Sequence, residues 1–189
     1  TLIKGLVTGI LAIALLAGAA VVSGDRSVVV SGAGYFPVLI RLQDNRLMAV
    51  LRGGAPHIGR LGRLDIVTSA DEGKTWSTPR TVIDGPDDDR NPALGQLKNG
   101  DIVLAYAIIH GYDETGLKLL AKQRSDRNVE GVFVMRSSDG GKTWSKPVLS
   151  EGIHALQKGG ATISPYGKIV QLADGTVLMA VYYEFFDDR

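Results

Sequence analysis

After residue 27, the hydrophobic positions form short runs of β-type residues that are separated by Gly, Asn and Asp, and no helical periodicity lasts beyond a couple of turns. Three stretches share one pattern: a proline leads an apolar run, a polar turn follows, and a second apolar run ends the unit. These stretches are 37–50, 92–106 and 165–182. The turns contain Asn, an Asn-Gly pair or an Asp-Gly pair, and these residues readily adopt the positive φ angles that a type I′ turn requires. Each stretch is therefore predicted to be a β-hairpin.

A second repeat follows each of the first two hairpins. Eight residues between Ser69 and Pro79 recur between Ser137 and Pro147, at a spacing of 68 positions, in the pattern Ser-x-Asp-x-Gly-Lys-Thr-Trp-Ser-x-Pro. Apolar runs flank both copies. A short Asp can accept hydrogen bonds from its own turn, and a Trp beyond the turn can bury its ring against the next element. Each copy is therefore predicted to be a further hairpin tip.

The composition narrows the possible chemistry. The 189 residues contain no Cys and only three His, which excludes disulfides, thiolate metal sites and a cysteine nucleophile and disfavours a histidine-rich metal site. Chemistry is left to carboxylates, Arg, Tyr, Ser or Lys, and we predict neither a metal nor a cofactor. The formal net charge is +1 and the Lys and Arg residues are scattered, so we predict no nucleic-acid partner.

The amino-terminal segment has the composition of an export signal. Lys4 precedes an almost unbroken apolar run over residues 5–22, and small residues at 17–20 offer a cleavage site. We predict a signal peptide over residues 1–25 and a secreted or periplasmic protein of bacterial type. The run also reaches the lower length limit of a membrane-spanning helix, so an uncleaved anchor is the alternative and the one route to membrane contact.

The repeated Ser-x-Asp-x-Gly-x-Thr-Trp is identified as the Asp-box, or bacterial neuraminidase repeat. Together with the hairpins it resembles successive four-stranded blades of the sialidase-type β-propeller, over about residues 31–187. The resemblance implies an all-β fold in which residues 27–189 form about two and a half blades, the N-terminal part of a propeller, since a closed ring needs roughly four to eight blades. In that family the boxes lie away from the catalytic face, so Asp71 and Asp139 are expected to be structural.

Sialidases carry an Arg-Ile-Pro motif whose Arg helps to bind the substrate carboxylate. Arg90, in the sequence Asp-Arg-Asn-Pro at 89–92, is similar to this motif, whereas Tyr35 occupies the corresponding place in the first hairpin. A guanidinium suits this role because it pairs with a carboxylate through two parallel hydrogen bonds and keeps its charge. The alternative is an Arg that the acidic residues 87–89 hold in a solvated loop.

The resemblance also implies a general acid after the second hairpin, where Asp113 is the best match. Such an acid needs a raised pKa, from burial or from a negative neighbour such as Glu114, and a solvated surface Asp is the alternative. Arg52 and His57 lie in a Gly-rich loop after the first hairpin, which is either a ligand-binding loop or a flexible connection. We count Arg52, His57, Asp89 and Glu114 as substrate-binding candidates.

Two classes of function follow. The first is an exported, exo-sialidase-like glycoside hydrolase that removes a terminal sialic acid or related acidic sugar from glycoconjugates. The second is a non-catalytic Asp-box propeller that binds glycan or protein, which the missing Arg in the first hairpin favours. The family's nucleophilic Tyr and Glu, and its two further arginines, come from later blades and find no match in this sequence.

Overall fold

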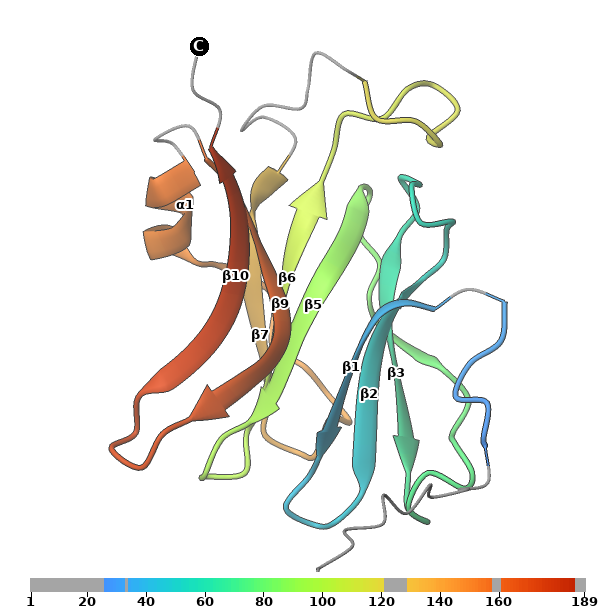
Figure 1. Ribbon diagram of the computed structural model, residues 1–189, viewed down its shortest axis with the longest axis vertical. Helices are drawn as coiled ribbons and strands as arrows, with labels where there is room; N and C mark the ends of the chain where they lie inside the picture. Colours follow the sequence, from blue (N-terminus) through green and yellow to red (C-terminus); the bar gives the residue numbers. More distant parts are fainter. Residues whose placement is uncertain (1–25, 33, 121–128, 158–160, 186–189) are drawn as a thin grey trace, which may run out of the picture.

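The computed structural model describes residues 26–185 except for 33, 121–128 and 158–160, and nearly all elements in this part of the chain are β-strands (Figure 1). The elements, in chain order, are β1 (Tyr35–Arg41), β2 (Leu47–Gly53), β3 (Arg63–Ser69), β4 (Arg80–Ile83), β5 (Asp88–Gln96), β6 (Ile102–Ile109), β7 (Val129–Ser137), β8 (Val148–Leu149), α1 (Glu151–Gln157), β9 (Ala161–Gln171) and β10 (Val177–Phe185). The hydrophobic pattern did not predict the short helix α1.

The strands form two sheets. The first has the order β1-β2-β3-β4, and the second has the order β10-β9-β5-β6-β7-β8. Within the second sheet, β5 to β8 repeat the four-stranded antiparallel order of the first sheet, and the hairpin β9-β10 begins a third unit. The predicted sialidase-like β-propeller arrangement of about two and a half blades is therefore confirmed.

All three predicted hairpins form, but their turns are not type I′. Each turn has a single residue at positive φ, namely Asn45 (69°), Gly100 (93°) or Gly175 (94°), and the amide of that residue donates to the carbonyl of Leu42, Leu97 or Leu172. A type I′ turn needs two successive residues at positive φ. The observed turns are of the longer kind in which a single left-handed residue follows the bend, so the prediction of the hairpins was right and that of the turn type was wrong.

Both Asp-boxes form the connection to the last strand of a blade, β3 to β4 and β7 to β8. Asp71 accepts hydrogen bonds from the Thr75 amide (2.9 Å), the Thr75 hydroxyl (2.6 Å) and the Ser69 hydroxyl (2.8 Å). Asp139 repeats these contacts with Thr143 and Ser137. The hydrogen bonds, that from the Thr75 hydroxyl first, lower the pKa of Asp71 to about 2. Both carboxylates therefore stabilise their turns.

The main core lies between the first two blades. Strands β1 to β3 contribute Val50 and Leu64, β5 and β6 contribute Leu94 and Leu104, and all four are completely buried. The third unit approaches the second much more closely, because β9 pairs with β5 in parallel over two residue pairs. A Cβ placed on Gly95 would lie 2.0 Å from the carbonyl oxygen of Ile169, so only glycine permits this approach.

The predicted signal peptide or anchor over residues 1–25 lies outside the described residues. Among the residues that the structure does describe, no helix is both long enough and apolar enough to cross a membrane. In the same residues, no group of three or more His, Asp or Glu side chains is arranged to hold a metal ion.

Candidate substrate-binding site

Strands β1 and β5 are interrupted by a β-bulge at the same place, directly after Tyr35 in β1 and after Arg90 in β5. The bulged residues, Phe36 and Asn91, each precede a proline and each have a φ of 53°. A bulky residue at positive φ is a strained conformation that occurs mainly at functional positions. Tyr35 and Arg90 stand immediately before the bulges, so they occupy equivalent positions in two successive blades.

Arg90 is held on one side and retains donor capacity on the other. Its Nη1 donates to Asp88 Oδ2 over 3.1 Å, and its Cζ lies 5.0 Å from the ring centroid of Phe36, within cation–π distance. The Nε atom is buried and has no hydrogen-bond partner among the described residues. A buried guanidinium nitrogen without an acceptor is costly, and an anionic ligand would satisfy it.

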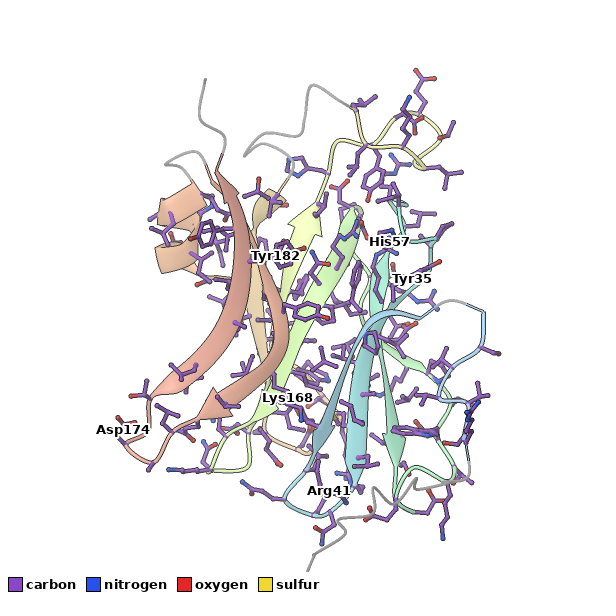
Figure 2. All side chains as sticks on the ribbon, in the orientation of Figure 1. Tyr35, Arg41, His57, Lys168, Asp174 and Tyr182 are labelled. Atoms are coloured by element: carbon purple, nitrogen blue, oxygen red, sulfur yellow. The ribbon has the colours of Figure 1, made fainter. Side chains whose placement is uncertain are left out.

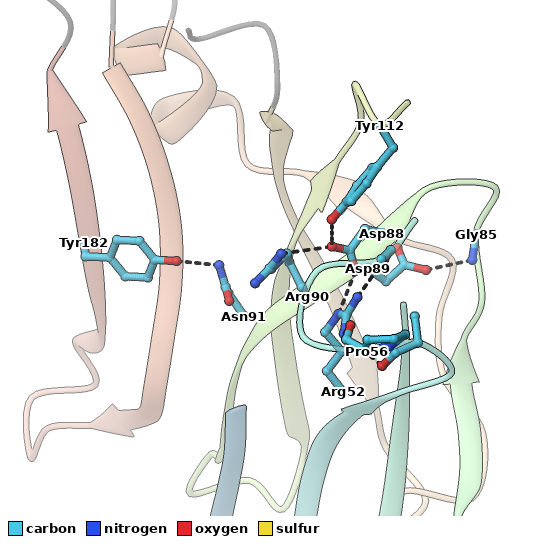
Figure 3. Close-up of polar contacts among 11 residues, drawn as sticks. Arg52, Pro56, Gly85, Asp88, Asp89, Arg90, Asn91, Tyr112 and Tyr182 are labelled. Atoms are coloured by element: carbon cyan, nitrogen blue, oxygen red, sulfur yellow. Dashed lines mark hydrogen bonds and ion pairs between the residues drawn. The ribbon is translucent and has the colours of Figure 1, made fainter. Parts of the chain in front are cut away.

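Asp88 joins two arginines and a tyrosine (Figure 3). Its Oδ1 accepts from Arg52 Nε over 2.6 Å, and its Oδ2 accepts from Arg90 Nη1 and from the Tyr112 hydroxyl, the latter over 2.5 Å. Asp88 and Arg52 have no exposed surface at all. One carboxylate is therefore shared between two guanidinium groups. We call Arg52, Asp88, Arg90 and Tyr112 the Asp88 network.

Arg52 directs its remaining donors at the backbone of the loop that follows β2. Its Nη1 donates to the Pro56 carbonyl over 2.7 Å, and its Nη2 donates to the Gly59 carbonyl over the same distance. The side chain is completely buried. Arg52, which we predicted to bind substrate, is thus buried and has its donors paired to protein groups.

Gly62 makes the Arg52–Asp88 contact possible. A Cβ at this position would lie 1.9 Å from Asp88 Oδ1 and 2.4 Å from Arg52 Nε, so any side chain would displace the ion pair. The Gly62 carbonyl also accepts from the Asp89 amide over 2.9 Å and thereby fixes the loop to the start of β5.

Aromatic side chains surround Arg90 on the side of the first blade. His57 is exposed, and its ring centroid lies 5.6 Å from that of Tyr35 and 5.3 Å from that of Phe36. On the opposite side the Asn91 amide donates to the Tyr182 hydroxyl from β10. Figure 2 shows Tyr35, His57 and Tyr182 toward the same end of the strands. His57, which we predicted to bind substrate, is thus exposed and packs on Phe36, the ring that also contacts Arg90.

Asp89 points away from Arg90, because successive residues of a strand face opposite sides (Figure 3). Only 1% of its surface is exposed, and its Oδ2 accepts from the Gly85 amide over 2.7 Å. Burial, followed by the nearby negative charge of Asp88, raises its pKa to about 6. The predicted substrate contact of Asp89 is closed off by this burial.

Asp113 does not have the environment that its predicted role needs. It accepts from the Thr115 hydroxyl over 2.7 Å and lies 3.3 Å from the amide nitrogens of Leu117 and Lys118. These hydrogen bonds, that of Thr115 first, hold the pKa of Asp113 below its usual range. A general acid needs the opposite, a raised pKa, and in this structure the Asp113 carboxylate stabilises its own turn. Glu114 beside it is exposed, and it does not raise this pKa.

Sequence reasoning missed three members of this region: Asp88, Tyr112 and Gly62. Residues 87–89 were considered as a solvated acidic loop, whereas β5 begins at Asp88 and buries it. Its spacing of two from Arg90 was the available signal, since alternate strand residues share a face. Tyr112 follows β6 and approaches Asp88 within the same blade, whereas the lack of room at Gly62 depends on a contact between different blades; no local pattern indicates either.

Comparison with solved structures supports the fold. The chain is similar to a protein of unknown function from Dyadobacter fermentans (25% identity, TM-score 0.55), covering 76% of this chain and 45% of that one. It is similar to the Hadza microbial sialidase Hz136, with 18% identity and a TM-score of 0.63, covering 80% of this chain and 32% of that one. It is also similar to the intramolecular trans-sialidase of Ruminococcus gnavus, with 12% identity and a TM-score of 0.59, covering 81% of this chain and 56% of that one. At these low identities the two sialidases are relatives in fold alone.

The chain therefore spans between about a third and just over half of the length of these structures. A comparison with curated proteins gives no match. The model of the BNR repeat-like domain matches residues 64–189, a range that contains part of the first four-stranded blade, all of the second and the third hairpin. Since this match covers more than half of the 189 residues, the chain belongs to the family of BNR repeat-like domains.

Proposed function

We propose that this chain supplies the anion-binding part of an exported, exo-sialidase-like glycoside hydrolase, which acts on a terminal sialic acid or related acidic sugar of a glycan. The observation that carries the proposal is Arg90, whose buried Nε has no acceptor among the described residues and whose carboxylate partner is shared with Arg52. A sugar carboxylate would complete the hydrogen bonding of the guanidinium.

The neighbouring groups suit a sugar ring. The rings of Tyr35, Phe36 and His57 offer apolar faces for the C–H side of a pyranose, and Asn91 and Tyr182 offer polar groups on the other side. In the proposal, Arg90 and His57 contact the sugar and the other residues shape the site. Asp113 is given no part in proton transfer.

A second candidate is a propeller of this family that binds an acidic glycan without cleaving it. The lowered pKa of Asp113 favours it, because the carboxyl group predicted as the general acid is instead used by its own turn. Both candidates use Arg90 in the same way, and they differ only in whether a bond is broken.

The test uses the intact protein and the fluorogenic methylumbelliferyl glycoside of N-acetylneuraminic acid. Hydrolysis is expected, with kcat/KM reduced about 100-fold in Arg90→Ala, since a hydrogen-bonded charge partner of the substrate is lost. The matched control is Arg41→Ala, an exposed arginine paired with Glu72 at the far end of the strands (Figure 2), which should leave the rate unchanged.

Calorimetric titration with N-acetylneuraminic acid separates the two candidates. Binding that depends on Arg90 without hydrolysis would favour the non-catalytic propeller. Neither binding nor hydrolysis, or equal values for Arg90→Ala and the wild type, would refute the proposed role of Arg90.

A further inference from the structure

We infer that Arg52 is a positioning residue, which acts on the substrate through Asp88 and sets the orientation of Arg90. The inference rests on the proposed function, since it assumes that Arg90 binds the ligand. It assigns to Arg52 a part that differs from the direct contact expected of a charged residue in a Gly-rich loop.

The first argument is the geometry of Asp88. Its carboxylate is fixed by two donors, Arg52 Nε over 2.6 Å and the Tyr112 hydroxyl over 2.5 Å. These two contacts leave Oδ2 directed at Arg90 Nη1, at 3.1 Å. Because Nη1 is held in this way, the rotation of the guanidinium is fixed and its Nε edge keeps one direction.

The ion pair of Arg52 and Asp88 is also tightly enclosed. Arg52 and Asp88 are completely buried, and both pack so closely on Gly62 that a Cβ there would lie 1.9 Å from Asp88 Oδ1 and 2.4 Å from Arg52 Nε. A buried Arg whose carboxylate partner moved would lose a charge-assisted hydrogen bond without gaining water. The Asp88 network therefore has one low-energy arrangement and not a set of alternatives.

The third argument is that Arg52 also holds the loop of His57. Two of its nitrogens bind the carbonyls of Pro56 and Gly59, on either side of His57 in the sequence. The same guanidinium thus fixes the loop that presents His57 and, through Asp88, the arginine beside which His57 lies. Arg52 links two groups of the site that come from different blades.

A double-mutant cycle on the intact protein tests this inference. Arg52→Lys keeps the positive charge and removes the planar fork, and we expect it to raise KM for the methylumbelliferyl sialoside about 10- to 100-fold with a smaller change in kcat. In an Arg90→Ala background the same change should have a smaller effect than in the wild type, since the route through Asp88 and Arg90 is gone and only the loop of His57 still connects Arg52 to the substrate. Effects that multiply in the double variant would overturn the inference.

Tyr112→Phe is the second variant, chosen because it removes one hydroxyl and leaves no buried charge unpaired. It should move KM in the same direction as Arg52→Lys, and less. The matched control, Arg41→Lys, alters an exposed two-point ion pair with Glu72 and should move neither KM nor kcat. If Arg52→Lys does not fold, an unchanged KM in Tyr112→Phe would count against the inference.

A readout without substrate distinguishes this inference from the proposed function. The Arg90 Nε–H signal in a nitrogen-15 NMR spectrum, assigned by its loss in Arg90→Lys, should shift in Tyr112→Phe and Arg52→Lys but not in Arg41→Lys. If that signal shifts while no acidic sugar binds, the positioning role stands and the proposed function fails. If the signal does not move in either variant, the positioning role is refuted, whatever the protein binds.

Discussion

Asp89 is a buried carboxyl group whose ionisation opposes folding, and replacing it with Asn should remove that opposition. Its Oδ1 is buried without a hydrogen-bond partner among the described residues, and its Oδ2 has the Gly85 amide alone. Burial, with Asp88, Asp84 and Asp87 nearby, raises the pKa to about 6 from 3.8. Asn keeps the acceptor for Gly85 and cannot ionise.

The sign and size of the change in unfolding free energy follow from these two pKa values. The folded protein binds the proton more tightly than the unfolded chain, so the carboxyl costs nothing below pH 3.8 and opposes folding increasingly as the pH rises toward 6. The difference is about two pKa units at about 1.4 kcal/mol each, which gives a cost of about 3 kcal/mol at neutral pH. Asp89→Asn should therefore gain little stability at pH 4 and about 3 kcal/mol at pH 7.

Urea unfolding of the intact protein, followed by tryptophan fluorescence at several pH values, measures this difference. Asp113→Asn is the control, because hydrogen bonds lower the pKa of Asp113 and its loss should destabilise above pH 3.8. The two variants should therefore depart from the wild type in opposite directions as the pH rises. A stability difference for Asp89→Asn that is the same at pH 4 and pH 7 would refute the reasoning.

Further predictions concern turns and close contacts. Gly62→Ala should lower the free energy of unfolding by about 3 kcal/mol or more, because its Cβ would separate Arg52 from Asp88, and a thermal melt would show this. Gly152→Ala is the control, because no atom lies within 4 Å of a Cβ placed on this glycine of α1. It should raise the free energy of unfolding by about 0.5–1 kcal/mol, and a lower melting temperature would contradict this. Asp71→Asn should lower the melting temperature at neutral pH without altering kcat/KM, and the loss should vanish as the pH falls through about 2, where the wild-type carboxylate is protonated.

The repeats made the architecture predictable from the sequence. Hairpins and Asp-boxes are local units whose turn residues and alternation carry their own signal, so the blade order could be inferred before the structure was known. The turn type could not, because Asp-Gly and Asn-Gly serve both the two-residue turn and the longer one seen here. The parallel pairing of β9 with β5 was also missed, since it depends on the space at Gly95.

The candidate site was predictable only in part. Arg90 was found because a proline marks its place in a repeated hairpin. Arg52 and Asp113 were assigned by residue type and position, and the structure shows that their neighbours decide what they do: Asp88 and three loop carbonyls occupy Arg52, and a Thr hydroxyl occupies Asp113. Asp88 comes from a different blade than Arg52 and leaves no trace in the sequence around it, whereas Thr115 lies only two residues after Asp113, so that turn was open to local reasoning.

The complete burial of β5 from Asp88 to Gly95 has a consequence for how the molecule opens. This strand is hydrogen-bonded to β6 on one side and β9 on the other, and it packs against the first blade. Local unfolding begins where few buried contacts resist it, as in the exposed residues of β10, and reaches such a strand last. Arg90 therefore lies in the segment whose amide protons should exchange most slowly, so the Asp88 network can stay assembled while the third unit, which carries Tyr182, opens and closes beside it.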